Sequence, residues 1–485
     1  MKTCIVFFMS LFLLFTVLYA QESEVSASGT SDKLLQESEN SSTDEEEKTS
    51  TVSADPGDEN DTVEETALPS DRIVKGIKRY LESEQWKERK KGVERIPAEL
   101  DTELKIDLIK MVIKDKNDNV RLEAVKVLNQ IADVAAIGLL QEALADPKNY
   151  IRSAALSGLI SIGQPAAESI GNTLSDDDED LRKRALVALR TMKKSTALKY
   201  TGLALDDRSS HIRETAIDDL YALYSSTPGG YNAPIIVRLL GKSINDDERK
   251  IRLKAIGYIS DIANDEALEV LIKGFDHKDA ETRMEVANAY NKIGGERVVG
   301  HLAKALSDND LKIRLKTLDI LERINTPSSL KMLATAITDR DYSIRLKVIN
   351  LLSVKGDSTV VDELGKALSD RKWDIRLSAV YTLGMIGDDE SIVLLCKALK
   401  DSDGEVQLAA IKTLTVLKSE KSLDKLGRYL VQSRDYRSET AQALGQINNR
   451  RALKYLLAVL AKEKDQAKKS IEEAVLKIMS AGPVN

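Results

Sequence analysis

Apolar residues recur along most of this chain at the three- and four-residue spacing of amphipathic helices, and short polar turns separate the apolar stretches. Residues 364–387 are a representative stretch. One apolar stripe there consists of Leu364, Ala367 and Leu368, residues 370–373 interrupt it, and a second stripe contains Ile375, Ala379, Val380, Leu383 and Ile386. The pattern predicts a helix, a short turn and a second helix.

The same unit repeats along the chain with a nearly constant period. An Arg early in the second helix marks eleven of the thirteen units, a Gln or a Lys takes its place in the other two, and successive markers lie 30–32 residues apart except for one interval of 39. The residue seven places after the marker is apolar in all thirteen units. The markers are Arg89, Arg121, Arg152, Arg182, Arg213, Arg252, Arg283, Arg314, Arg345, Arg376, Gln407, Arg437 and Lys468. This period predicts an all-α fold, an α-solenoid (superhelix) of about thirteen helix pairs.

An Asp stands six residues before the marker in nine of the units. The order of apolar residues, small residues, Asp and then Arg resembles the HEAT repeat, in a short form similar to the phycobilisome-lyase-type repeat, over residues 71–482. The resemblance implies that these charged residues form a structural ladder between repeats. An Arg at the positive end of a helix dipole is also unfavourable unless a carboxylate lies close to it. The expected ladder includes Asp146, Arg152, Asp308, Arg314, Asp339, Arg345, Asp370 and Arg376.

The two segments that precede the repeats differ from them in composition. Residues 1–20 combine Lys2, a short apolar run and Leu-Tyr-Ala, which predicts a signal peptide cleaved after Ala20 and a secreted or periplasmic protein of bacterial type. An uncleaved anchor is the alternative. Residues 21–70 hold fifteen Asp and Glu against two Lys, which predicts a disordered acidic leader. The HEAT-like solenoid is then residues 71–485, with an insertion near 224–234 that contains Pro-Gly-Gly.

Residue patterns that would indicate catalysis or a bound metal are missing from the sequence. The three histidines lie in separate repeats without metal-ligand spacing, and the sequence has no Gly-rich phosphate loop or nucleophile elbow. Once the signal is removed, Cys396 is the only cysteine. We therefore expect a protein that is not an enzyme and that has no cofactor and no metal.

The exposed side of the second helices is the predicted binding surface, and the expected ligand is another protein. A weakly basic row lies two residues after the marker, and exposed aromatic residues accompany it. We expect a monomer that binds no nucleic acid and has no membrane-spanning segment after signal removal. The alternatives are an enzyme with scattered catalytic residues and a nucleic-acid-binding array, which export argues against. The candidate binding residues are Arg184, Lys254, Lys316, Lys347, Tyr258, Arg323 and Tyr381, with Tyr224 and Tyr231 from the insertion.

Overall fold

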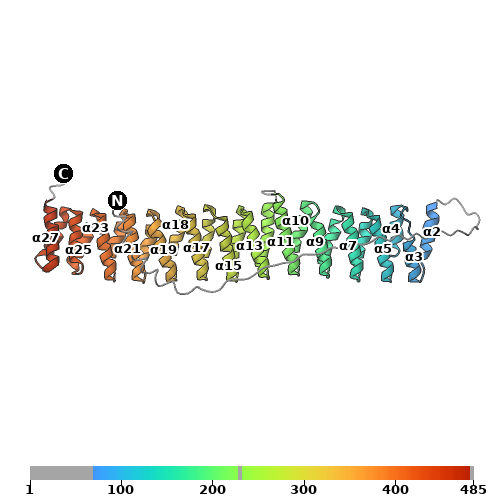
Figure 1. The fold of residues 1–485 in the computed structure, drawn as a ribbon, viewed down its shortest axis with the longest axis horizontal. Helices are drawn as coiled ribbons and strands as arrows, with labels where there is room; N and C mark the ends of the chain where they lie inside the picture. The colour runs from blue at the N-terminus through green and yellow to red at the C-terminus, as the bar shows by residue number, and fades with distance from the viewer. Residues whose placement is uncertain (1–68, 228–231, 481–485) are drawn as a thin grey trace, which may run out of the picture. The chain divides into compact units, whose positions relative to one another are not determined.

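The computed structural model of the protein describes residues 69–227 and 232–480, which form two compact units, unit 1 (69–158) and unit 2 (159–480). The predicted signal peptide and nearly all of the acidic leader lie outside the described residues. All regular secondary structure in the described part of the chain is helical (Figure 1), which confirms the predicted fold class. None of the described helices has the length and apolar character that a membrane crossing requires.

Unit 1 contains helix pairs in the predicted order. Its first helices are α2 (Pro69–Leu81), α4 (Thr102–Lys110) and α6 (Ile137–Ala143), and its second helices are α3 (Trp86–Glu94), α5 (Asp118–Ile131) and α7 (Asn149–Ile162), in which the division between the units falls. A 3-10 turn, η1 (Val134–Ala136), leads into α6. The helices α3 and α5 pack against each other, as second helices of consecutive pairs do in a solenoid.

Unit 2 continues the same alternation. Its first helices are α8 (Ala167–Asn172), α10 (Lys194–Ala204), α12 (Ala233–Lys242), α14 (Asp265–Leu271), α16 (Ala303–Leu306), α18 (Pro327–Ala334), α20 (Val361–Ala367), α22 (Asp389–Ala398), α24 (Leu423–Gln432) and α26 (Leu453–Leu460). Its second helices are α9 (Glu179–Arg190), α11 (Ser210–Ser225), α13 (Arg249–Ile262), α15 (Ala280–Ile293), α17 (Leu311–Ile324), α19 (Tyr342–Lys355), α21 (Trp373–Ile386), α23 (Gly404–Leu417), α25 (Arg437–Ile447) and α27 (Asp465–Ser480). Neighbouring second helices in unit 2 lie side by side in chain order (Figure 1).

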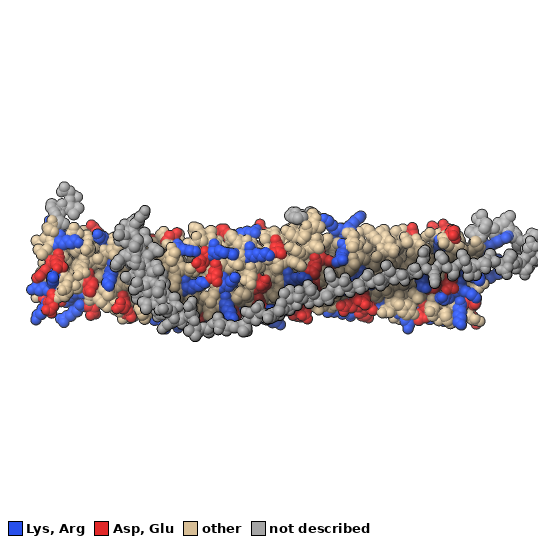
Figure 2. Space-filling model, viewed as in Figure 1, with Lys and Arg blue, Asp and Glu red and all other residues tan. Residues whose placement is uncertain are grey.

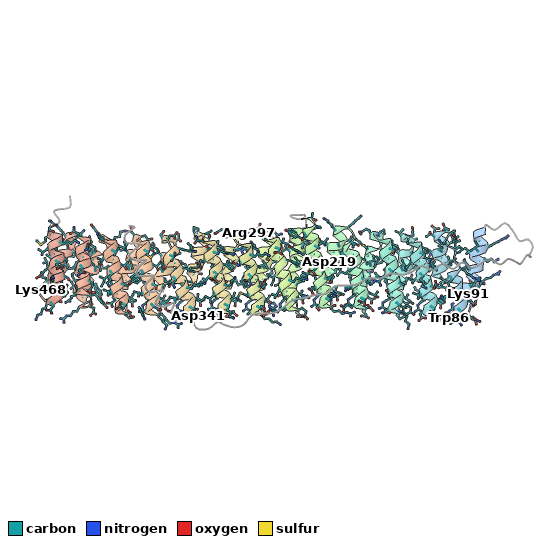
Figure 3. The ribbon with its side chains drawn as sticks, in the orientation of Figure 1. Trp86, Lys91, Asp219, Arg297, Asp341 and Lys468 are labelled. Carbon is teal, nitrogen blue, oxygen red and sulfur yellow. The ribbon has the colours of Figure 1, made fainter. Side chains whose placement is uncertain are left out.

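Short 3-10 segments extend many of the first helices. In unit 2 they are η2 (Gln164–Ala166), η3 (Thr173–Ser175), η4 (Ser243–Asn245), η5 (Ile272–Asp276), η6 (Glu296–Leu302), η7 (Thr335–Thr338), η8 (Ser358–Val360), η9 (Glu420–Ser422) and η10 (Arg450–Ala452). The turn inside each pair and the connection between pairs lie on opposite edges of unit 2. In Figure 3, Asp341, in the turn before α19, lies on the lower edge, and Arg297, in η6, lies on the upper edge.

The second helices begin and end at fixed positions of the repeat. Six of those described begin after a side chain that accepts a backbone N–H of the first turn, among them α17 after Asp310, α19 after Asp341 and α23 after Asp403. Several end at a residue in the left-handed conformation eleven places after the marker. These C-cap residues include Ala132, Ala263, Asn325, Gly387, Lys418 and Asn448. An Ala or Lys here holds a conformation that favours Gly.

The core is formed by the residues that keep the repeat in phase. The apolar residue seven places after the marker is buried in every described unit except at Ile96, which is half-buried. The small residues three places after the marker, among them Ala216, Ala255, Ala379 and Ala410, are fully buried, so that neighbouring helices approach closely. The extra residues of the interval of 39 lie between α11 and α12, and positions 228–231 of that connection, including Tyr231, are outside the described residues.

Candidate functional site

The charged ladder connects each helix pair to the next through one guanidinium group. Arg345 donates from Nε to Oδ2 of Asp370 at 2.6 Å and from Nη2 to Oδ1 of Asp370 at 3.2 Å. Its Nη1 donates to the backbone carbonyl of Asp339, six residues earlier, at 3.0 Å. The Asp370 carboxylate also accepts the backbone N–H of Lys372 at 2.9 Å. Each Arg therefore binds the carboxylate of the following pair and the backbone of its own pair.

The same contact recurs through both units. The pairs are Arg89–Asp115 and Arg121–Asp146 in unit 1, and Arg182–Asp207, Arg213–Asp246, Arg283–Asp308, Arg314–Asp339, Arg345–Asp370 and Arg376–Asp401 in unit 2. Arg152 Nη1 donates to the carbonyl of Asp146 at 3.0 Å. Burial alone would raise the pKa of Asp308, but Arg283 and the Asp310 N–H hold that pKa below its ordinary value.

The hydrogen bonds of the ladder differ at two positions where its Asp or its Arg is replaced, His277 and Gln407. His277 stands at the Asp position, and its Nδ1 accepts the Asp279 N–H at 3.1 Å as a carboxylate would. Arg252 is left to bind the Thr282 hydroxyl at 2.9 Å and the Asp279 carboxylate at 3.0 Å. Burial and the nearby Arg252 lower the pKa of His277. At Gln407, the side-chain amide still donates to the Asp401 carbonyl at 2.6 Å.

The predicted binding residues Lys254 and Tyr258 lie in a cluster on the exposed side of α11 and α13. Lys254 Nζ binds Glu214 at 2.9 Å and Asp218 at 2.8 Å, and the Tyr258 hydroxyl donates to Asp218 at 2.8 Å. The ring of Tyr258 stacks on Tyr221, with centroids 4.0 Å apart. Burial and the hydrogen bond to Asp218 raise the pKa of Tyr258. The ammonium of Lys254 is thus balanced by two carboxylates of the preceding pair.

The other predicted binding residues lie on separate second helices. Lys347 forms an ion pair with Asp319, and Arg323 donates to the backbone carbonyl of Asn291. Lys316 is half-buried on α17 and forms no ion pair with the described residues. Basic and acidic side chains are interspersed over the visible part of unit 2 (Figure 2). Their role in binding stays a prediction.

Three further predicted residues have distinct surroundings. Arg184 is half-buried on α9, and Tyr381 is half-buried on α21, where burial raises the pKa of its hydroxyl. Tyr224 lines a cleft of about 280 Å³ between α10, α11 and α12, together with Leu198, Leu223 and Ile236. The structure therefore groups Tyr258 and Lys254 but places the remaining candidates apart.

An exposed apolar stripe on the second helices was missed by the sequence reasoning. Val354, Met385 and Val416 lie nine places after the marker on three consecutive helices, α19, α21 and α23, and are 74%, 48% and 38% exposed. The signal was present in the sequence, because all three share one repeat position.

The described residues offer no group of three or more His, Cys, Asp or Glu side chains arranged to hold a metal ion. Cys396, on α22, is half-buried among apolar residues, and burial raises the pKa of its thiol to about 11. A thiol with that pKa is almost entirely protonated at neutral pH and is a poor nucleophile.

The family model that describes HEAT repeats matches residues 106–170, 237–318, 330–414 and 392–475, which is more than half of the chain. Among curated proteins, none matches the sequence. Similar solved structures include human deoxyhypusine hydroxylase, with 20% identity, 51% of this chain and 97% of that chain covered, and a TM-score of 0.24.

The karyopherin Kap121p, bound to the extreme C-terminus of the protein phosphatase Cdc14p, is a second similar structure. It has 12% identity and a TM-score of 0.32, and 85% of this chain and 54% of that chain are covered. The chain thus spans about half the length of this karyopherin. An engineered protein is 17% identical, with 84% of this chain and all of that chain covered and a TM-score of 0.25.

Proposed function

Since this chain belongs to the HEAT-repeat family, we propose that it is a protein-binding scaffold and that its binding face is the exposed side of the second helices in unit 2. Arrays of this architecture are typical of protein-interaction scaffolds, because stacked repeats present an extended surface. The observation that carries the proposal is the apolar stripe of Val354, Met385 and Val416.

The stripe is not required for packing. The equivalent position holds Asp261, Lys292 and Arg323 in the three preceding pairs, whose helices pack in the same way. Charged side chains are therefore compatible with the fold at this position. Apolar residues at this position on three consecutive second helices expose apolar surface to water without stabilising the stack, and such an exposed apolar surface is a feature of interaction sites.

Exposed apolar residues on the first helices lack this alignment. Val393, Val431 and Leu457 are 54%, 42% and 55% exposed on α22, α24 and α26, but they stand at three different positions of the repeat. Scattered exposed apolar residues are normal on any protein surface. The alignment distinguishes the stripe from that background.

The surroundings of the stripe suit a protein partner. Tyr381 lies one helical turn before Met385 on the same side of α21, and the ion pair of Lys347 with Asp319 lies on α19 and α17. An apolar centre with an aromatic residue and a polar border is the usual composition of a protein interface. Burying each of the three side chains contributes about 1 kcal/mol to binding.

The spacing of the stripe also restricts the partner. Packed helices lie about 8–10 Å apart, and a helix rises about 1.5 Å per residue. A partner helix that crosses α19, α21 and α23 therefore meets the stripe with apolar residues about five to seven positions apart.

We further propose that the protein is exported and that its signal peptide is removed after Ala20. The support is the short apolar run behind Lys2 and the Leu-Tyr-Ala that precedes Gln21. Intact-mass measurement of the native protein tests this proposal. A mature chain should begin at Gln21, whereas a mass that includes residues 1–20 would show that the segment is retained.

The binding proposal is tested by capture from the native envelope fraction with the full chain as bait. The variant V354S/M385S/V416S should lose the principal captured protein, and V393S/V431S/L457S, which removes three apolar residues from the first helices, should retain it. Both variants should keep the far-ultraviolet circular dichroism of the parent, because all six side chains are exposed. Equal capture by the two variants would refute the stripe as the binding site.

A further inference from the structure

A cationic and aromatic patch lies at the turn edge of unit 2, at the other end of α21 from the stripe. We call Arg340, Arg371, Lys372, Tyr342 and Trp373 the turn patch; the three cations lie in the turns that precede α19 and α21, and the two aromatic residues begin those helices. Asp341, labelled on the lower edge in Figure 3, marks its position. The three cationic side chains are exposed, and Trp373 is 45% exposed.

The positive charges of the turn patch are not neutralised by carboxylates. Arg340 donates to the carbonyl and the side-chain amide oxygen of Asn309, at 2.9 and 3.4 Å, and Arg371 donates to the carbonyl of Arg340 at 3.4 Å. No described carboxylate lies within ion-pair distance of Arg340, Arg371 or Lys372. Three like charges therefore occupy two adjacent turns and repel one another.

An equivalent Arg elsewhere in the array shows what is missing. Arg208 stands at the same repeat position as Arg340 and donates to the backbone of the preceding turn in the same way. There, however, the neighbouring side chain is Asp177, whose carboxylate pairs with Arg208 at 3.4 Å. At Arg340 the corresponding residue is the neutral Asn309. Arg340 and Arg208 therefore occupy the same repeat position, and Arg340 lacks only the carboxylate that Arg208 has beside it.

Lys372 also differs from the N-cap residues of the nearby second helices α17, α19 and α23. This residue is the N-cap of α21 and makes no side-chain capping bond, whereas Asp310, Asp341 and Asp403 cap the neighbouring second helices. A Lys at the positive end of a helix is electrostatically unfavourable. A local choice that opposes folding marks a position with another role.

The carboxylates closest in sequence to the turn patch already have partners. Asp374 accepts the hydroxyl of Tyr342 and the N–H of Ile375, and Asp341 accepts the N–H and the hydroxyl of Ser343. The ammonium of Lys372 lies 5.9 Å from the centre of the Tyr342 ring. The three cations are therefore exposed to solvent, and the ring of Tyr342 lies near one of them, Lys372.

We propose that the turn patch binds an acidic peptide segment of the partner protein that carries an apolar side chain. The segment's carboxylates would pair with Arg340, Arg371 and Lys372, and its apolar side chain would pack on Trp373. Trp, Tyr and Arg are the residues most enriched among those that dominate protein-binding energies. This proposal rests on the scaffold function above and adds the chemistry of the ligand and a second contact site.

An acidic peptide fits the patch better than a nucleic acid does. The cations of the turn patch occupy two adjacent turns, and the same edge of unit 2 carries Asp177, Asp178 and Glu179 before and at the start of α9 and Asp247 and Glu248 before α13. A nucleic acid extending along this edge would meet those carboxylates, because its phosphates are closely and evenly spaced. A short acidic segment contacts the turn patch alone.

Trp373 supplies a built-in reporter for the test. The chain has two tryptophans, so that W86F leaves Trp373 as the sole indole in the full chain. The probe is a short synthetic peptide of Asp and Glu with two Leu, and its control replaces every acidic residue with Ser. The measurement is the change in Trp373 emission and in its quenching by acrylamide during titration.

The acidic peptide should shift the emission to the blue and lower the quenching, and high salt should reverse both changes because the charges are exposed. Added to W86F, the pair R340E/R371E should weaken binding about tenfold or more, whereas R208E, at the same repeat position but ion-paired, should change it less than about twofold. The neutral peptide should not bind.

Three results would overturn the proposal. One is an unchanged titration for R340E/R371E. Another is binding of a single-stranded oligonucleotide in place of the acidic peptide, which would assign the patch to nucleic acid. The third is protection of Trp373 before any peptide is added, which would assign the patch to acidic residues of this chain. These outcomes are independent of the stripe, because Trp373 is the first residue of α21 and the stripe residue Met385 lies at the opposite end of that helix, next to its last residue, Ile386. If the chain does not bind the acidic peptide but still captures its partner protein through the stripe, only the proposal for the turn patch is refuted.

Discussion

Removal of Arg345 should destabilise the array by about 3 kcal/mol. The Arg345 and Asp370 side chains are only 4% and 8% exposed, so the ion pair is largely shielded from water. In R345A the carboxylate keeps the Lys372 N–H but loses two charged donors, and the Asp339 carbonyl loses its donor. Truncating one partner of a buried ion pair costs about 3–5 kcal/mol. The lower end applies because Asp370 lies at a turn, where water can enter.

The matched control is K347A, two residues further along α19. Lys347 also forms an inter-repeat ion pair, but its side chain and that of Asp319 are 31% and 53% exposed. An exposed pair is worth less than about 1 kcal/mol. The double variant R345A/D370A should cost less than the sum of the single changes, because removing both partners leaves no unpaired charge.

Urea denaturation followed by circular dichroism measures these differences. R345A should also lower the dependence of the unfolding free energy on urea, because weaker coupling between repeats makes unfolding less cooperative. If the unfolding free energy of R345A lies within about 0.5 kcal/mol of the parent, as expected for K347A, the ladder is not the coupling element.

Three other substitutions test separate features. The pKa of His277 is lowered in the folded protein, so its contribution to stability is complete above about pH 6.5 and declines as the pH falls through the folded value. H277D, which offers Arg252 a carboxylate, should make the melting temperature less dependent on pH between about pH 7 and pH 5. Ala263 has a φ of 51°, so A263G should raise the unfolding free energy by about 0.5 kcal/mol in urea melts. Burial raises the pKa of Asp219 despite its pairing with Arg190, and one carboxylate oxygen has no hydrogen-bond partner. D219N should therefore stabilise by about 1 kcal/mol at neutral pH, and the gain should shrink as the pH falls through the raised folded pKa of the carboxyl.

The sequence was sufficient to predict the helix pairs and their phase. The marker Arg, the apolar residue seven places later and the small residue three places later recur because each repeat packs against a nearly identical neighbour. The same regularity pointed to Asp and Arg as ladder residues. It could not identify which Asp each Arg binds. Arg345, for example, is six residues from Asp339 and twenty-five from Asp370, and it binds the backbone of the first and the carboxylate of the second.

Contacts across the insertion were beyond sequence reasoning. Tyr221 stands eight places after its marker and Tyr258 six places after the next, so no shared position links them, yet their rings stack. Their contact depends on how α11 and α13 are rotated against each other, and residue spacing along the chain does not determine that rotation. The partners of Lys254 were hidden for the same reason, because Glu214 and Asp218 belong to the preceding pair.

Met385 tests the account's central claim, that the stripe on the second helices is where the protein binds its partner. Met385 is 48% exposed at the centre of the stripe. Met111 and Met479 are 44% and 63% exposed but lie in helix pairs that carry no stripe residue, so they serve as internal controls. Hydroxyl-radical oxidation, read by mass spectrometry with and without the captured partner, reports all three side chains in one sample. The account predicts that the partner lowers oxidation of Met385 by about threefold or more, as expected for burial in an interface core, and leaves Met111 and Met479 unchanged. Equal oxidation of Met385 in the free and bound protein would contradict it.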